Sequence, residues 1–419
     1  MKLTDPFSMD NIHIHTFPNG ITIVHREVTH TRVLHCGFVL DIGSRDEAEP
    51  QEGLAHFWEH MAFKGTSKRK SFHIINRLEA VGGELNAYTT KEKIWFHASV
   101  LDQHFERALE LLKDITFNSV FPEKEIEKEK NVILEEMSMY LDSPEDAIQD
   151  DFEALLFREH PLAHNILGTQ KSVSSFRQKN FKEFLRENMD NERLIFSSIG
   201  NIPFAKIKQA CEKHLSEIPV HKSKKKRSRI SEMKSLSEVV LKPISQAHCM
   251  MGRAGYSVKD KKRVPLFMLT NLLGGPAMTS RLNMTLRERK GLVYSIDASY
   301  TPLTDTGLFS IYFGTEKKQV EHSLELIRKE FKLLRDTKLG DVQLHSLKEQ
   351  IKGQLAIAEE NNINFMQMMG RSLLDSGKIE SLEEVIRSVE EVSAETLRNL
   401  ANEFLKESKF TSLTFLPEL

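Results

Sequence analysis

The most constraining feature of this sequence is the run His56-Phe57-Trp58-Glu59-His60. A helix places residues i, i+3 and i+4 on one face, so two imidazoles and one carboxylate would converge there. Imidazole nitrogen suits Zn²⁺ better than Mg²⁺ or Ca²⁺, and a carboxylate between two ligands can take a proton from water. The motif therefore predicts a helix with a hydrolytic zinc site, in which His56 and His60 are ligands and Glu59 is the general base.

A catalytic zinc needs a third protein ligand, and a second predicted helix, at residues 123–140, offers one. It follows a proline and ends at a turn-like Asp-Ser-Pro sequence. Its predicted inward face carries carboxylates among apolar side chains, namely Glu129, Val132, Ile133, Glu136 and Tyr140. Because burying a carboxylate is costly without a cation or hydrogen bonds, these glutamates indicate a metal site. A solvated acidic face is the alternative explanation for such a run.

Three stretches resemble the pitrilysin and insulysin family of zinc peptidases, which carry the inverted H-x-x-E-H motif. They are GLAHFWEHMAFKGT at 53–66, GGELNAYTTKEK at 82–93 and EKEKNVILEEM at 127–137. The two-domain branch, with the β subunit of mitochondrial processing peptidase and its bacterial relatives, is the most similar in pattern. The family's spacing between the motif and its third ligand implies that this ligand is Glu136. The resemblance also implies a supporting catalytic role for Glu129, two helical turns earlier.

The resemblance extends to the residues that would bind substrate. It implies that residues 83–87 pair with the peptide as an added edge strand, with hydrogen bonds from Asn86 and Ala87. In the second half, SRLNMTLRERKGLVYS at 280–295 is similar to the family's substrate-binding region. There an arginine and a tyrosine, here Arg287 and Tyr294, reach the bound peptide.

The chain is organised as two halves around a basic run at 222–229, which lacks apolar residues and is typical of a solvated connector. We expect a zinc-binding catalytic domain at 1–221, a linker at 222–235 and a similar, metal-free substrate-binding domain at 236–419. A weak repeat, ALELLKDI at 108–115 and SLELIRKE at 323–330, supports duplication and aligns Ala108 with Ser323. The resemblance implies an α+β fold of two homologous sandwiches, each a mostly antiparallel sheet packed with helices.

Composition excludes several other classes of protein. A net charge of −2 indicates no bulk preference for nucleic acid. No segment reaches ~18 consecutive apolar residues, so we expect no membrane span. The first ten residues lack the regions of a signal peptide and the arginines of a transit peptide, so we expect a cytoplasmic protein. The three cysteines, Cys36, Cys211 and Cys249, are scattered among apolar neighbours and are expected to be buried thiols.

These patterns together predict a zinc metalloendopeptidase with one Zn²⁺ per chain, acting on unfolded peptides or short polypeptides inside a closed chamber. A non-catalytic subunit is the alternative, because the family includes partners that keep the fold and lose the ligands. All three ligands and Glu59 are present here. Four-domain relatives build their chamber from two halves, so we expect this two-domain chain to form a homodimer. A heterodimer with a metal-free homologue is the alternative assembly.

Overall fold

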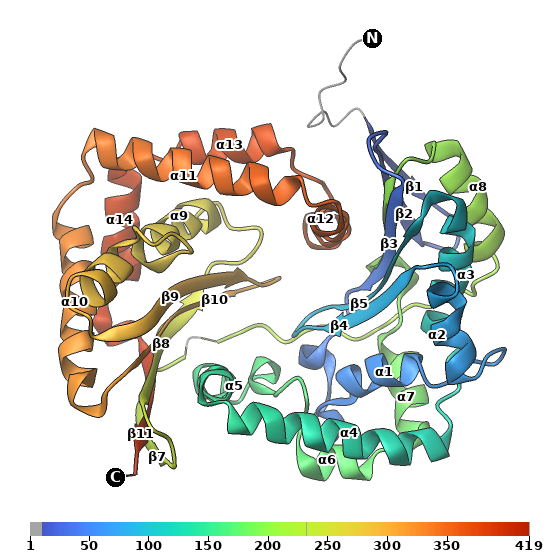
Figure 1. Ribbon diagram of the computed structural model, residues 1–419, viewed down its shortest axis with the longest axis horizontal. Coiled ribbons are helices and arrows are strands. Elements are labelled where there is room, and N and C mark those ends of the chain that lie inside the picture. Colours follow the sequence, from blue (N-terminus) through green and yellow to red (C-terminus); the bar gives the residue numbers. More distant parts are fainter. Residues whose placement is uncertain (1–10, 232, 419) are drawn as a thin grey trace. The chain divides into compact units, whose positions relative to one another are not determined.

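The computed structural model describes residues 11–231 and 233–418, which form two compact units (Figure 1). The first unit contains the residues up to 137, together with 164–228 and 357–381. The second contains 138–163, 229–356 and the residues from 382 onward. Each unit therefore takes one segment from the other half of the sequence, which differs from the expected contiguous domains with boundaries at 221 and 235.

The first unit is built on a six-stranded sheet in the order β1-β2-β6-β3-β5-β4. All neighbouring strands are antiparallel except β2 and β6, which run parallel. Asn19 and Gly20 lie in the turn between β1 and β2, and the φ of +92° at Gly20 explains the glycine there. The strands are β1 (Ile12–Thr16), β2 (Thr22–Glu27), β3 (Val33–Leu40), β4 (Glu84–Thr89), β5 (Ile94–Leu101) and β6 (Leu194–Gly200).

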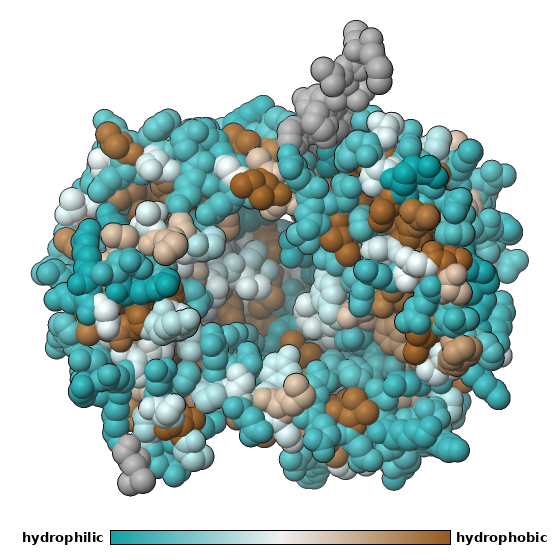
Figure 2. All heavy atoms as spheres, viewed as in Figure 1, coloured by the Kyte–Doolittle hydropathy of each residue, from teal (hydrophilic) through white to brown (hydrophobic). Residues whose placement is uncertain are grey.

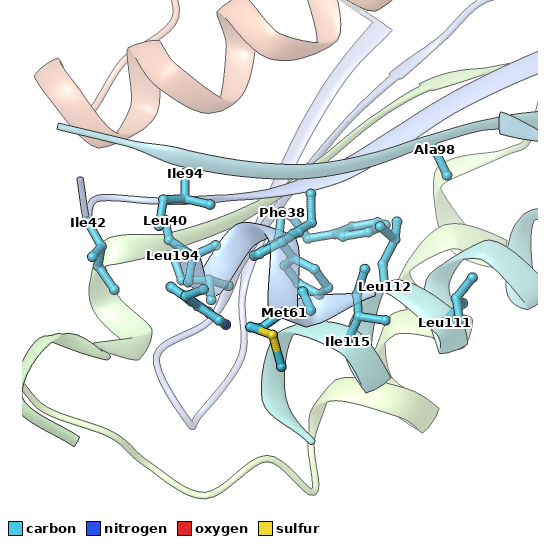
Figure 3. Close-up of a cluster of buried hydrophobic side chains, with 14 of the residues drawn as sticks. Phe38, Leu40, Ile42, Met61, Ile94, Ala98, Leu111, Leu112, Ile115 and Leu194 are labelled. Atoms are coloured by element: carbon cyan, nitrogen blue, oxygen red, sulfur yellow. The ribbon is translucent and has the colours of Figure 1, made fainter. Parts of the chain in front are cut away.

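Helices cover one face of this sheet, and the main hydrophobic core of the unit lies between these helices and the strands. Figure 3 shows side chains of β3, β5 and β6 meeting Met61 of α1 and Leu111, Leu112 and Ile115 of α3. Phe176 is fully buried in an extended conformation and separates the two helices at 170–175 and 178–188. The helices are α1 (Leu54–Ala62), α2 (Ser71–Glu79), α3 (Phe105–Phe117), α4 (Glu123–Asp142), α6 (Gln170–Ser175), α7 (Gln178–Asn188) and α8 (Phe204–Leu215).

The opposite face of the sheet is covered by α12 (Asn362–Ser376), which comes from the C-terminal half of the sequence. Ser197 of β6 donates a hydrogen bond to the carbonyl oxygen of Met366 at 2.6 Å. Lys93 forms a 2.6 Å ion pair with Asp375, and both side chains are largely buried. A sheet with two apolar faces needs cover on both sides, and this requirement explains why residues 357–381 belong to the first compact unit.

The second unit repeats the same plan. Its sheet has the order β7-β11-β8-β10-β9, with β7 parallel to β11 and the other pairs antiparallel. β7, β8 and β10 follow β2, β3 and β5 at nearly the same sequence offset that the repeat predicted. The strands are β7 (Ser237–Lys242), β8 (Ala247–Gly255), β9 (Val293–Pro302), β10 (Gly307–Thr315) and β11 (Thr411–Pro417).

Helices again cover both faces of this second sheet. The helix α5 (Pro144–Leu156), from the N-terminal half of the sequence, lies against β8 and β11. The unit also contains α9 (Arg263–Gly274), the π-helical turn η7 (Asn283–Glu288), α10 (Val320–Asp336), α11 (Asp341–Glu359), α13 (Leu382–Glu390) and α14 (Ala394–Phe404). The expected fold of two α/β sandwiches with mostly antiparallel sheets is thus confirmed.

The basic run at 222–229 is more than a solvated connector. The guanidinium of Arg227 donates two hydrogen bonds to the carboxylate of Asp46, at 2.9 and 2.7 Å, and one to the carboxylate of Asp41 at 2.8 Å. Arg45 also donates to the carbonyl oxygen of Ser228 at 2.9 Å. Most of the run is exposed, as expected for a connector, but Arg227 is largely buried, because a cation can be buried when several carboxylates compensate its charge.

The three cysteines lie where the sequence predicted them, in the interior of the protein. The face drawn in Figure 2 is mostly hydrophilic, with hydrophobic side chains in scattered patches. No helix in the described part of the chain is both long and apolar enough to cross a membrane. Cys36, Cys211 and Cys249 are buried free thiols, as predicted.

Candidate metal centre

The motif residues lie on α1, the helix that the sequence predicted for them. Phe57, Trp58 and Met61 are fully buried and fix the orientation of the helix against the core. The ring centroids of His56 and His60 are 4.5 Å apart, one helical turn from each other. The apolar residues within and next to the motif therefore hold the two imidazoles on a shared face.

The start of α1 is held by Glu47, a residue that sequence reasoning missed. Its two carboxylate oxygens accept hydrogen bonds from the backbone N–H of Gly53, at 2.9 Å, and of Ala55, at 2.7 Å. Burial raises the pKa of Glu47 well above its usual value, and the two N–H donors act in the opposite direction. An acidic residue shortly before a helix can signal a helix cap. Glu47 lies outside the motif, so the motif gave no indication of this role.

The backbone conformation and the close packing at Gly53 both require a glycine. Its φ is +88°, and a Cβ there would lie 2.5 Å from the carbonyl oxygen of Leu167 and 2.8 Å from Cα of Gly168. The backbone of the loop before α6 thus passes directly against the start of α1. This close approach accounts for both glycines and fixes the helix from a second side.

The third candidate ligand, Glu136, reaches the two histidines from α4. Its Oε2 atom lies 3.8 Å from Nε2 of His56 and 3.6 Å from Nε2 of His60. A tetrahedral zinc with ligand bonds near 2.0–2.2 Å requires ligand atoms roughly 3.3–3.6 Å apart. Within the described residues, His56, His60 and Glu136 form the one cluster that could hold a metal ion, with donor atoms within 4.8 Å of one another. The donor set and its spacing fit Zn²⁺.

The inward face of α4 differs in part from the predicted one. Glu129 and Ile133 are buried as expected, and Glu136 is half-buried at the site. Val132 and Tyr140 were expected on the same face, but they are 49% and 42% exposed. The buried stripe is rotated about the helix axis relative to the predicted one, and it consists of Ile126, Glu129, Lys130, Ile133 and Met137.

Glu129 lies behind His60 rather than among the ligands. Nδ1–H of His60 donates to Oε1 of Glu129 at 2.9 Å, and the ammonium of Lys64 lies 2.6 Å from Oε2. Burial opposes ionisation, but the contacts with His60 and Lys64 prevail and lower the pKa of Glu129. Because Nδ1 carries the proton, the lone pair of His60 Nε2 faces Glu136 and is available to a metal.

The two histidines differ in their electrostatic environment. Burial lowers the pKa of His56 to about 3, with a smaller contribution from His60, so His56 is neutral. Burial also acts on His60, but the surrounding carboxylates, led by Glu129, raise its pKa. A bound cation would compete for the same carboxylates, and this favours the neutral ligand form that metal binding requires.

Glu59 contacts strand β4 and does not face the core. Thr89 donates a hydrogen bond from Oγ1 to Oε2 of Glu59 at 2.7 Å. Burial raises the pKa of Glu59, and the hydrogen bond from Thr89 opposes that shift. Sequence reasoning named Glu59 but not Thr89, since no local pattern connects a strand threonine with a helix 30 residues away.

The expected peptide-binding residues Asn86 and Ala87 lie on β4, an edge strand of the first sheet. They are opposite His97 and Phe96 of β5, which leaves the other side of β4 without a partner strand in the sheet. The remaining two, Arg287 and Tyr294, belong to the second unit. Tyr294 is 84% exposed on β9, an edge strand of the second sheet.

The second unit lacks the counterpart of the motif. When the two copies are aligned through Ala108 and Ser323, the positions corresponding to His56, Glu59 and His60 are Asn271, Gly274 and Gly275. Two of these have no side chain, and the third offers only an amide. The expectation that the metal cluster belongs to the first copy alone follows from this difference.

Comparison with known proteins identifies the family. Residues 22–170 match the sequence model of "Insulinase (Peptidase family M16)", and residues 175–351 match that of "Peptidase M16 inactive domain". An uncharacterized zinc protease of Bacillus subtilis (strain 168) is 33% identical over 395 residues, covering 94% of this chain and 95% of the relative. One from Rickettsia felis is 29% identical over 407 residues, covering 97% and 96%. The chain belongs to the insulinase family, peptidase family M16, and to its branch with two domains per chain.

Solved structures support the fold. The peptidase M16 inactive domain from Pseudomonas fluorescens superposes with a TM-score of 0.90 at 19% identity, covering 98% of this chain and 99% of the other. A protease from Helicobacter pylori gives a TM-score of 0.88 at 20% identity, covering 97% and 99%. At such identities the likeness shows the shared architecture and does not extend to activity.

Proposed function

We propose that this protein is a zinc-dependent endopeptidase with one Zn²⁺ per chain, held by His56, His60 and Glu136. One observation carries the proposal. Two imidazole nitrogens and a carboxylate oxygen converge within 4.8 Å, and the carboxylate of Glu59 lies on the same helix between the two histidines. This is the donor set of a catalytic zinc site, which keeps one position open for water or substrate.

The roles of the side chains follow from their positions. When bound, Zn²⁺ supplies Lewis acidity that polarises a peptide carbonyl and acidifies water. Glu59 accepts a proton from the attacking water and passes it to the amine that leaves when the peptide bond breaks. Glu129 holds the proton of His60 on Nδ1. Each group is a ligand, a base or a positioning group, and no nucleophilic side chain is required.

The edge strand β4 supports unfolded peptides as substrates. An extended peptide could add to its free side through backbone hydrogen bonds, with Asn86 and Ala87 as partners. Main-chain pairing depends little on sequence, so short or unfolded polypeptides would be accepted and folded domains excluded. Cleavage of one sequence should therefore fall when it is embedded in a folded domain.

We propose further that the active assembly is a homodimer that encloses a chamber. Arg287 and Tyr294 of one subunit would complete the zinc site of the other. Glu59→Gln and Tyr294→Phe homodimers should each be poor enzymes, whereas a mixed dimer contains one site with both residues intact. Activity should return when subunits exchange. If exchange is demonstrated and restores nothing, or if the monomer is active, the shared-site proposal fails.

The activity itself is tested with unstructured peptides of defined length, followed by mass spectrometry with and without a chelator. Wild-type protein should cleave them only when zinc is bound. Glu59→Gln should keep its zinc and lose turnover by several orders of magnitude, because the base is removed and the ligands remain. Full zinc content without cleavage in the wild-type homodimer would favour the non-catalytic subunit of a heterodimer instead.

A further inference from the structure

Thr89 joins the proposed general base to the edge strand. It is the last residue of β4, and its Oγ1 donates to Oε2 of Glu59 at 2.7 Å. Contact between these two residues links α1 to the strand that carries Asn86 and Ala87. A hydrogen bond to an ionised carboxylate is stronger than one between neutral groups, so this contact restricts the rotamers of Glu59.

The position of the Thr89 hydroxyl is fixed by the sheet. Side chains alternate along a strand, so Leu85, Ala87 and Thr89 share one face of β4. Leu85 and Ala87 pack on the core that also contains α1, which orients this face toward the helix. Thr89 is paired with Ile94 of β5 at the end of the hairpin.

The turn after Thr89 adds a second restraint. Oγ1 of Thr90, the next residue, accepts a hydrogen bond from the backbone N–H of Lys93 at 2.9 Å and donates one to the carbonyl oxygen of Lys93 at 3.0 Å. The backbone N–H of Thr90 also donates to that carbonyl oxygen at 2.8 Å. The backbone beside Thr89 is thereby held, and its hydroxyl is preorganised toward Glu59.

We infer that Thr89 is a positioning residue for peptide hydrolysis: it holds one oxygen of Glu59 so that the other is directed to the attacking water. This inference rests on the proposed function. Thr89 belongs to the strand on which a peptide would pair. Strand β4 would therefore fix the positions of both Glu59 and the peptide backbone. A peptide paired in register with β4 is then also held at a fixed position relative to Glu59.

The test compares Thr89→Val and Thr89→Ser with wild type, and uses Ser99→Ala as the matched control. Valine keeps the shape and the branching of threonine but cannot donate. Ser99 is a hydroxyl residue of the neighbouring strand β5 that bonds His35 at 2.8 Å and not Glu59. A lost hydrogen bond to a charged group corresponds to roughly a tenfold to hundredfold fall in kcat for Thr89→Val. KM, zinc content and thermal unfolding should stay at wild-type values.

Thr89→Ser should recover most of the kcat, since it restores the donor, and Ser99→Ala should match wild type. An unchanged kcat in Thr89→Val, a rise in KM alone, a parallel loss of zinc, or failure of serine to rescue would each overturn the inference. Wild type and Glu59→Gln are assayed alongside. If wild type cleaves and Glu59→Gln does not, any of these contradicting outcomes concerns the role of Thr89 only. If wild type shows no zinc-dependent cleavage, the proposed function fails together with the role of Thr89.

Discussion

Oε1 of Glu129 lies 2.9 Å from Nδ1 of His60, while Oε2 of the same carboxylate lies 2.6 Å from the ammonium of Lys64. The buried glutamate is thus held from two sides. Its contact with His60 decides which imidazole nitrogen faces Glu136, and its contact with Lys64 compensates its charge. The ligand geometry therefore depends on two residues that are not ligands.

Glu129→Gln and Lys64→Met should each weaken zinc binding by roughly tenfold to a hundredfold, because the orientation of His60 is lost or its partner moves. Zinc affinity is measured by competition with a chromophoric chelator. Glu127→Gln is the matched control, since Glu127 is exposed on the same helix and pairs with Lys130 and Arg177. Affinities equal to that of the control would show that Glu129 does not support the site.

Glu47→Gln should destabilise the start of α1. Both oxygens of Glu47 accept backbone N–H groups, and an amide would direct its own N–H₂ group at one of these donors. We expect a loss of about 1–3 kcal/mol in the free energy of unfolding and weaker zinc binding. Urea denaturation measures the first effect. The exposed Glu49→Gln is the control, and identical unfolding curves for the two variants would contradict the capping role.

Arg227→Met should destabilise the first unit by about 3–5 kcal/mol, because the buried carboxylate of Asp46 would lose its ion pair and that of Asp41 would keep only Arg193. Thermal and urea unfolding measure the loss. Lys226→Met, at an exposed position next to it, should have little effect. If both variants unfold like wild type, the basic run is only a connector and its contacts add no stability.

Two buried histidines away from the metal cluster should make stability depend on pH. Burial lowers the pKa of His25 and of His97 to about 4, from the usual 6.5. The folded state thus binds these protons less readily than the unfolded chain. Their stability contribution is fully present above pH 6.5 and is lost as the pH falls from 6.5 toward 4, by about 1.4 kcal/mol per pH unit for each group.

The variant His25→Gln isolates one of these contributions. Its unfolding free energy should fall less steeply between pH 6.5 and pH 5 than that of wild type, by about 1.4 kcal/mol per pH unit. Other titrating groups, including those of the metal cluster, cancel in this comparison. Parallel slopes for the two proteins would mean that His25 does not remain neutral in the fold.

The sequence was most informative where one helix carries the whole pattern. His56, Glu59 and His60 follow from the helical period, and Glu129 and Glu136 from a second helix together with the family resemblance. Val132 and Tyr140 were wrongly placed on the buried face of α4. The apolar residues of this helix spread widely enough around it to be compatible with two orientations. The position of its buried stripe is decided by packing against the core, which periodicity alone does not contain.

Contacts between residues distant in sequence could not be foreseen in the same way. Glu47 caps α1 from outside the helix, Thr89 reaches Glu59 across from a strand, and Arg227 returns to the loop at Asp46. Helix α12 joins the first unit because the second face of its sheet is apolar, a demand that becomes visible only once the strands are assembled. Each of these depends on the tertiary fold and not on local pattern.

Two adjacent residues of α4 provide the most direct test of zinc binding by His56, His60 and Glu136. Glu136 faces the histidines, whereas Glu135 is exposed on the other side of the helix. Zinc per chain is measured by elemental analysis after dialysis of wild type, Glu135→Gln and Glu136→Gln. We expect about one zinc per chain in the first two proteins and a large loss in the third. Equal zinc content in the two variants would show that Glu136 is not a ligand.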